Sequence, residues 1–460
     1  MVHGSLLVSA VLSSATSNLT PTGASGPDAE AQIARNLLYE SGFNLLSGVH
    51  GGMIAYASLV VAKTCLQASP SHLALLLAAF PCGAFLGSLW ASLGRRWGMQ
   101  RLVMAMNFGG SLPLLAVPWV TQIPGLRPAD GFTALMTVCL LLYSAMKMGQ
   151  SSMYRATYPA AFRGRAVGQL LFCNYLAMVL TILVAGWLVD ERWNDPTNYR
   201  WLYPLTAVAG LGSCWFYGRI RPMEAVRAAS AVTVREAWKQ VGDVLSRDRD
   251  FRWFQLSFFL NGSAFFMASH VVVELCRTRL HFDAVPLALA MGVVPLAVLA
   301  VCSPIWGRVL DRLGIVMLRV LVATAMTCYL ACYFLGLACE WPALIFVGSV
   351  LRGISEGGGQ VSWALASVQF APAIEDVPIY NSIHFTLNGV RGLAMPWVGI
   401  LLLASIGSWT VFVACLLSGV SIFVGLNLAE SIRVRQDQAA EVPAGAPLPG
   451  PLGSELAARP

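Results

Sequence analysis

The chain has 460 residues, of which 57% are hydrophobic and only 12% charged, and its mean hydropathy is +0.65. Soluble globular domains are roughly 45–50% apolar and about 25% charged, so this composition excludes an ordinary soluble fold. The net charge of +7 does not indicate a nucleic-acid partner, because the basic residues form short clusters between apolar stretches. The sequence therefore predicts an integral membrane protein that binds no nucleic acid.

Twelve stretches are long and apolar enough to cross a bilayer, which takes about 20 mostly apolar residues in a helix. The twelve ranges, in chain order, are 42–64, 71–93, 102–120, 131–153, 166–189, 201–219, 253–275, 285–305, 315–338, 342–368, 380–404 and 407–429. The fold class expected is an all-α membrane protein with two six-helix bundles.

Charge and composition divide the chain further. A charged stretch over 220–252 separates a six-helix bundle at 41–219 from a second one at 253–429. Residues 1–40 and 430–460 are poor in apolar periodicity, and we expect both segments to be disordered. Whether the first 20 residues belong to the mature chain stays open at this point.

The basic residues also predict the orientation. With a cytoplasmic N-terminus, 21 of the 30 Lys and Arg residues fall on the cytoplasmic side and six on the other side. Cytoplasmic loops of membrane proteins carry an excess of Lys and Arg, so both termini are expected inside. The preference for Arg over Lys favours a bacterial cytoplasmic (inner) membrane.

The two halves resemble each other in sequence. Phe43-Asn44-Leu45 aligns with Phe254-Gln255-Leu256 at a shift of 211 residues. Arg-Arg-Trp-Gly ending at Gly98 aligns with Asp-Arg-Leu-Gly ending at Gly314 at a shift of 216. Internal repeats of this kind are how many transporters build a site that opens to each side in turn. The spacing predicts a duplicated six-helix unit.

The second of these segments resembles a known signature. Residues 307–314 read Gly-Arg-Val-Leu-Asp-Arg-Leu-Gly, which is similar to the G-x-x-x-D-R-x-G signature of the major facilitator superfamily. The resemblance extends over the chain in helix count, long central loop and loop signatures. It implies a secondary transporter that moves a small solute by alternating access, with the lipid bilayer as surroundings, and we expect a monomer.

The resemblance also implies a gating latch, in which an aspartate of the signature stabilises one access state. The first copy, GSLWASLGRRWG over 87–98, keeps glycines and a basic pair but has Arg95 where the repeat alignment calls for aspartate. Asp311 is therefore the stronger candidate. The residues assigned to the gating motif are Gly307, Arg308, Asp311, Arg312, Gly314, Gly87, Arg95, Arg96 and Gly98.

Four charged residues lie at bilayer depth, where each costs roughly 2.5–3.5 kcal/mol on insertion scales and usually marks function. They are Lys147, Arg352, Glu356 and Arg391. Helical spacing groups three of these charges with other polar residues into two stripes. One stripe holds Arg352, Glu356 and Gln360, next to Gly357–Gly359, and the other holds His384, Asn388 and Arg391. We interpret these stripes as walls of a central polar cavity.

The roles of these charges stay open between two interpretations. Arg352 and Glu356 form either a structural pair or a site at which Glu356 gains and loses a proton. Lys147 and Arg391 either take part in substrate contact or gating, or they form structural hydrogen bonds. Three cations against one acid favour an anionic substrate in a cavity of low dielectric constant.

Three further polar residues are weaker candidates for the same cavity. His50, Asn261 and His270 lie in the first and seventh spans, which the resemblance places around the cavity. A single histidine in a membrane helix is more often a packing residue than a ligand, and both interpretations stay open.

Enzymatic and metal-binding patterns are missing from the sequence. We find no phosphate-binding loop and no His-Glu-x-x-His, and none of the 11 cysteines forms a Cys-x-x-Cys pair. We expect no enzyme, no cofactor and no metal. The alternatives to an anion carrier are an efflux carrier for lipophilic drugs or cations, and a membrane receptor or assembly factor that transports nothing.

Overall fold

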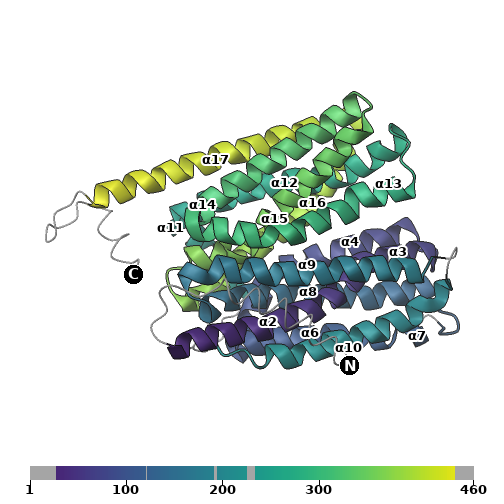
Figure 1. The fold of residues 1–460 in the computed structure, drawn as a ribbon, viewed down its shortest axis with the longest axis horizontal. Coiled ribbons are helices and arrows are strands. Elements are labelled where there is room, and N and C mark those ends of the chain that lie inside the picture. The colour runs from purple at the N-terminus through teal and green to yellow at the C-terminus, as the bar shows by residue number, and fades with distance from the viewer. Residues whose placement is uncertain (1–26, 121, 191–193, 225–233, 441–460) are drawn as a thin grey trace.

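The computed structural model describes residues 27–120, 122–190, 194–224 and 234–440, and these residues form helices and turns without any β-strand. The helices gather in two bundles that lie side by side with their axes roughly along the same direction (Figure 1). One bundle holds α2 to α10 and the other α12 to α17.

The first bundle is built from six helical passes, several of them interrupted. Their elements are α2 (Pro27–Gly52), the π-helical turn η1 (Met53–Ala57), α3 (Ser58–Thr64), α4 (Pro70–Phe85), α5 (Gly87–Trp97), α6 (Met99–Leu115), α7 (Val117–Val120), α8 (Pro128–Thr157), α9 (Ala160–Leu188), η2 (Pro196–Asn198) and α10 (Tyr199–Tyr217).

The second bundle follows a helix of the central loop. Its elements are that helix, α11 (Val234–Arg247), then α12 (Arg249–Thr278), α13 (Ala284–Ala288), η3 (Leu289–Val293), α14 (Val294–Ala338), α15 (Pro342–Phe370), η4 (Ile374–Asp376), α16 (Val377–Ile406) and α17 (Trp409–Ala440).

Each of the twelve expected spans coincides with helical backbone in this order. Within the described residues, seven helical segments are long and apolar enough to cross a membrane, and the bent pair α4 and α5 makes an eighth. One of the seven, Val285–Ala338, turns back on itself at Gly314, whose φ of 75° ends one helix and starts the next. This segment therefore contains both the eighth and the ninth expected span.

The prediction of disorder next to the bundles is wrong where the structure describes those segments. α2 begins at Pro27, and α17 continues past Glu430 to Ala440. Polar contacts hold both extensions, because Asn36 donates to the backbone oxygen of Arg221 at 2.7 Å and Arg435 pairs with Asp250 at 2.5 Å. Residues 1–26 and 441–460 lie outside the described residues.

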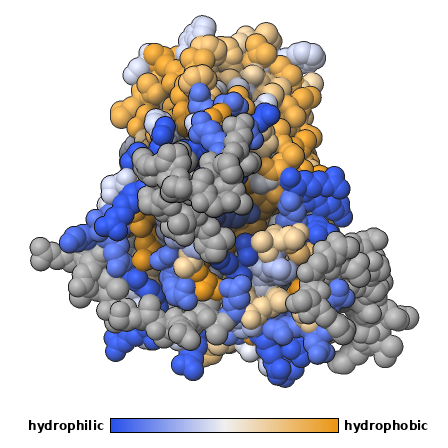
Figure 2. All heavy atoms as spheres, turned by 90° about the vertical axis from the view of Figure 1, so that its left-hand side faces the viewer, coloured by the Kyte–Doolittle hydropathy of each residue, from blue (hydrophilic) through white to orange (hydrophobic). Residues whose placement is uncertain are grey.

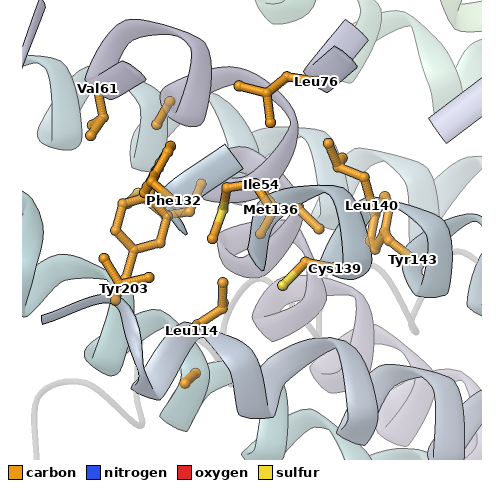
Figure 3. Close-up of a cluster of buried hydrophobic side chains, with 14 of the residues drawn as sticks. Ile54, Val61, Leu76, Leu114, Phe132, Met136, Cys139, Leu140, Tyr143 and Tyr203 are labelled. Atoms are coloured by element: carbon orange, nitrogen blue, oxygen red, sulfur yellow. The ribbon is translucent and has the colours of Figure 1, made fainter. Parts of the chain in front are cut away.

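Each bundle has an apolar core of its own. In the first bundle, the Phe132 and Tyr203 rings meet edge to face with centroids 5.3 Å apart, beside Ile54 and Leu114 (Figure 3). Aromatic pairs of this geometry add to the free energy gained by burial alone. The side chains labelled in Figure 3 come from η1, α3, α4, α6, α8 and α10, so they connect several passes of this bundle.

The bundles meet closely at one end, where α2 begins, α17 ends and α11 lies; we call it the α11 end. Here Gly164 of α9 and Gly307 of α14 face each other so closely that a Cβ on either would meet the backbone oxygen of the other. At a second crossing between the bundles, a Cβ on Gly389 of α16 would meet the backbone of Phe85 at the end of α4. Glycine is required at these helix crossings because only a hydrogen side chain leaves room for such an approach.

The surface fits a bilayer. Hydrophilic side chains gather over the α11 end, and hydrophobic side chains cover the flank above it (Figure 2). Large apolar side chains point outward on several helices, for example Leu205, Trp397, Leu401 and Phe423, each at least 66% exposed. Apolar side chains in such positions are stable against lipid rather than against water.

Candidate functional site

A cavity of about 380 Å³ lies between the two bundles. That size suits a small organic molecule. Its polar lining residues are Lys147, Gln150, Ser151, Asn261, Arg319, Arg352, Ser355, Glu356, Gln360, Asn388 and Arg391. Its aromatic lining residues are Tyr56, Phe80, Tyr143, Tyr154, Tyr175, Phe258, Phe265, Phe266, Tyr329 and Trp363.

Two arginines of the second bundle approach one phenyl ring. The guanidinium carbon of Arg319 lies 4.2 Å from the centroid of the Phe258 ring, and that of Arg391 lies 4.6 Å from it. Both side chains are buried, with 4% and 5% of their surface exposed. Among the described residues, neither has a carboxylate within 4 Å.

Neutral groups hold these two guanidinium groups in place. Arg391 donates to the side-chain oxygen of Asn388 at 2.7 and 3.2 Å and to the backbone oxygen of Phe258. Arg319 donates to the side-chain oxygen of Asn261, while its Nε is buried without a partner in the structure. Since amide oxygens orient a guanidinium without cancelling its charge, the wall around Phe258 carries two uncompensated positive charges.

A third arginine of the lining is neutralised. Nε of Arg352 lies 2.7 Å from a carboxylate oxygen of Glu356, one helical turn further along α15. The Arg352 guanidinium also lies 5.5 Å from the centroid of the Phe265 ring. The pair brings no net charge to the cavity, so Glu356 is not available there as a free acid.

Lys147 provides the positive charge of the opposite wall. It belongs to α8 of the first bundle, and its ammonium nitrogen lies 5.3 Å from the centroid of the Tyr143 ring. No carboxylate lies within 4 Å of it in the described part of the chain. Cations of both bundles therefore face one cavity.

The structure brings most of the sequence candidates together. Those that line the cavity are Lys147, Asn261, Arg352, Glu356, Gln360, Asn388 and Arg391. Gly357 and Gly358 do not break α15, which stays helical, and they let α15 pack against α14, because a Cβ on Gly358 would meet Val322 and Trp306. The transport roles of the lining residues stay predictions.

The three histidine candidates lie elsewhere. His50 is buried in the first bundle with its ring edge-on to Tyr143, and His270 is exposed on α12. His384 lies behind the cavity wall, where its Nδ1 is 3.1 Å from the Gln255 side-chain oxygen. Helical spacing predicts that His384 shares the face of Arg391, and both contact the Phe258 ring, with centroid distances of 4.4 and 4.6 Å. His384 lies two helical turns nearer the start of α16 and outside the cavity lining.

The gating motif forms a junction between the bundles. The Asp311 carboxylate accepts hydrogen bonds from the backbone N–H groups of Gly164 at 2.7 Å and Arg165 at 2.9 Å, and it pairs with the Arg165 side chain at 3.3 Å. Gly164 and Arg165 are the fifth and sixth residues of α9, so the carboxylate binds amide groups in the second turn of that helix through charge-assisted hydrogen bonds. Arg308, Arg312 and Arg96 are exposed.

The first copy of the motif differs in more than one position. Gly98 and Gly314 both end a helix with positive φ, 88° and 75°, as the repeat alignment predicts. The contacts between the bundles align the two copies at their first glycine instead. A Cβ on Gly87 would meet the backbone oxygen of Ser382, just as a Cβ on Gly307 would meet that of Gly164. Eleven residues separate Gly87 from Gly98, whereas seven separate Gly307 from Gly314, so the first copy has one extra helical turn. When the two copies are aligned on Gly87 and Gly307, the residue that corresponds to Asp311 is Ala91 and not Arg95.

Arg95 contacts the central loop instead. Its guanidinium donates to the side-chain oxygen of Gln240 in α11 at 3.5 Å, and α11 packs its Val241, Val244 and Leu245 beside Val377 and Tyr380 of α16. The extra turn of α5 thus reaches a helix that the sequence did not predict.

A cluster of neutral polar groups closes the α11 end below the cavity. Asn381 of α16 donates to the backbone oxygen of Met148 and to Ser152, each at 2.8 Å, and accepts from Ser367 at 2.8 Å. Ser151 donates to the backbone oxygen of Ala364 at 2.6 Å. These bonds join α8 of one bundle to α15 and α16 of the other.

Sequence reasoning missed three buried polar residues. Glu40 was assigned to the disordered N-terminal segment, Arg319 was counted with the cytoplasmic loops, and Asn381 was not singled out. A signal existed for Arg319, because it lies inside the expected span 315–338. Glu40 lies two residues before an expected span, and its burial depends on how far α2 extends.

Two helical bundles with a charged cavity between them define a multi-pass membrane protein of the transporter class. A family model described as Major Facilitator Superfamily matches residues 43–373, more than half of the chain, and the chain belongs to that superfamily. No curated protein matches it in sequence.

Solved structures share the fold. The chain is similar to the human organic anion transporter MFSD10, with 14% identity, a TM-score of 0.63, and coverage of 86% of this chain and 97% of that one. The proton:xylose symporter XylE has 14% identity, a TM-score of 0.64, and coverage of 85% and 95%. FucP, in the outward conformation, has 10% identity, a TM-score of 0.65, and coverage of 85% and 98%. At such identities the likeness concerns the fold alone.

Proposed function

We propose that this protein is a secondary transporter that carries a small organic anion across a membrane. The observation that carries the proposal is the approach of Arg319 and Arg391 to one ring, with no carboxylate within 4 Å among the described residues. Two buried guanidinium groups without counter-ions are costly, and an anionic ligand offsets that cost. The lipophilic-cation alternative requires a free acid in the cavity, whereas Glu356 is paired with Arg352.

The rest of the lining supports the organic part of the substrate. Aromatic side chains of both bundles surround the cations, and such surfaces suit a ring or another flat apolar body. MFSD10, which shares the fold of this chain at 14% identity, is an organic anion transporter, and this agrees with the proposal. The substrate is thus expected to combine one anionic group with an apolar body.

Alternating access is the proposed mechanism. The cavity lies between the bundles, and the contacts that close the α11 end are hydrogen bonds to neutral side chains, backbone groups and Asp311. When the bundles rock apart, water replaces the protein partners in these hydrogen bonds. The excess of Lys and Arg at this end supports a cytoplasmic orientation, and we propose the bacterial cytoplasmic membrane as the location.

Counterflow in proteoliposomes tests the proposal. The panel contains benzoate, phenyl phosphate and succinate, with benzamide and benzylammonium as neutral and cationic analogues of benzoate. We expect exchange of at least one aromatic anion and none of the two analogues. Exchange of benzylammonium or benzamide in preference to every anion would contradict the proposal.

A further inference from the structure

One buried acid of the first bundle has no part in the cavity described above. Glu40 of α2 is only 1% exposed, and the Tyr158 hydroxyl donates to its carboxylate at 2.8 Å. It has no ion pair within 4 Å in the described ranges. A buried carboxylate in this situation carries a negative charge only if a cation nearby compensates for it; otherwise it binds a proton.

The groups that face Glu40 are few. Tyr154 and Lys147 lie on α8, Tyr158 lies directly after it, and Tyr217 lies on α10. The tyrosines are neutral at ordinary pH, and α9 brings no cation to within 4 Å of Glu40. Asn44 donates to the backbone oxygen of Glu40 at 2.8 Å and accepts from Gln150 at 3.2 Å, and Lys147 lies one helical turn before Gln150 on α8. Lys147 also lines the cavity, so its positive charge lies between Glu40 and the cavity.

We propose that Glu40 is a proton-binding site of the transport cycle, and that Lys147 couples its charge to the anion in the cavity. This inference rests on the proposed function, since it needs an anion that engages Lys147. It places the proton in the first bundle and not at Glu356, whose carboxylate is already paired with Arg352.

The coupling follows from competition for one ammonium group. In the empty cavity the charge of Lys147 compensates the Glu40 carboxylate. A bound anion takes up that charge, so Glu40 becomes an uncompensated buried carboxylate and binds a proton from the cavity. By reciprocity, a protonated Glu40 leaves Lys147 free and raises the affinity for the anion. One negative charge and one proton then cross together, without net charge for a monovalent anion.

The structure offers a short way for the proton. Gln150 and Tyr154 line the cavity. Gln150 donates to the side-chain oxygen of Asn44 at 3.2 Å, and Asn44 in turn donates to the backbone oxygen of Glu40 at 2.8 Å. Glu40 is thus separated from the cavity by one layer of polar side chains.

Infrared titration of the full-length protein in lipid nanodiscs tests the site without any anion. We expect a protonated-carboxyl band that disappears as the pH rises, that is lost in Glu40→Gln and that persists in Glu356→Gln. Tyr158→Phe keeps the acid and removes its donor, so the band is expected to stay and to shift in frequency. A band unchanged in Glu40→Gln, or no band at any pH in the unmodified protein, overturns the proposal.

Proton uptake on anion addition tests the coupling. Benzoate is added to unbuffered protein with a pH indicator, and we expect proton uptake by the unmodified protein and by the exposed control Asp437→Asn but none by Glu40→Gln. In proteoliposomes, Glu40→Gln is expected to keep benzoate counterflow and to lose accumulation driven by a pH gradient. Equal pH-driven accumulation by Glu40→Gln and the unmodified protein overturns the coupling. If no panel anion is exchanged while the infrared band behaves as expected, the proposed substrate class fails and the proton site stands.

Discussion

A carboxylate oxygen of Asp311 lies 2.7 Å from the backbone nitrogen of Gly164, and this contact joins α14 of one bundle to the start of α9 in the other. The acid binds amide groups in the second turn of a helix that belongs to the opposite half of the molecule. Rocking of the bundles at the α11 end therefore has to break charge-assisted hydrogen bonds, which favours the closed arrangement of this end.

Replacement of this acid tests the junction. Asp311→Asn removes the charge that faces the N–H groups of Gly164 and Arg165, and charge-assisted hydrogen bonds contribute about 1.5–3 kcal/mol. We expect hydrogen exchange of these two amides to become about tenfold faster, which corresponds to about 1.4 kcal/mol. Asp437→Asn is the control, because Asp437 is 70% exposed and forms a long pair with Arg433. Unchanged exchange in Asp311→Asn would show that the contact does not hold the end closed.

The glycine crossing gives a second prediction. In Gly164→Ala the new methyl group would meet the backbone oxygen of Gly307 and the Asp311 carboxylate. Overpacking of this kind costs about 1–3 kcal/mol, so we expect a lower thermal midpoint and reduced counterflow. Gly186→Ala on the same helix meets nothing within 4 Å and is expected to stabilise by about 0.5–1 kcal/mol. Equal midpoints for the two variants would contradict the close approach of α9 and α14.

The Arg352–Glu356 pair predicts a non-additive effect on stability. Arg352→Met alone leaves the Glu356 carboxylate in the cavity wall without its partner, and breaking a buried pair costs about 3–5 kcal/mol. We expect the double variant Arg352→Met/Glu356→Met to unfold at a higher temperature than either single variant, as measured by size-exclusion chromatography after heating. A double variant less stable than both singles would indicate that each residue stabilises the fold separately.

The sequence predicted the architecture well and the site in part. The twelve spans follow from apolar length, and the 3.6-residue period of α15 placed Arg352, Glu356 and Gln360 on one face that lines the cavity. His384 shares the face of Arg391 and also contacts Phe258, but it lies two turns nearer the start of α16 and outside the cavity lining. Periodicity predicts which face of a helix is polar, but not how far along that face the cavity extends.

The missed residues show what sequence reasoning lacked. Arg319 lies only five residues after Gly314, so it reads as a loop cation, yet the helix that starts there is already inside the bundle. Glu40 is buried because α2 begins 13 residues before it and packs against α9 and α10. Both cases depend on the packing of distant helices, which local composition does not encode.

The direct test of the anion site compares the counterflow of benzoate with that of benzamide, which has nearly the same shape and no charge. Both substrates are tested with the unmodified protein, Arg319→Gln and Arg391→Gln. Arg308→Gln is the control, because that arginine is exposed at the α11 end and outside the cavity lining. We predict benzoate exchange by the unmodified protein and the control, little or none by the two cavity variants, and no benzamide exchange by any of them. Equal exchange of benzoate and benzamide, or full benzoate exchange without either cavity arginine, would contradict an anion site at Phe258.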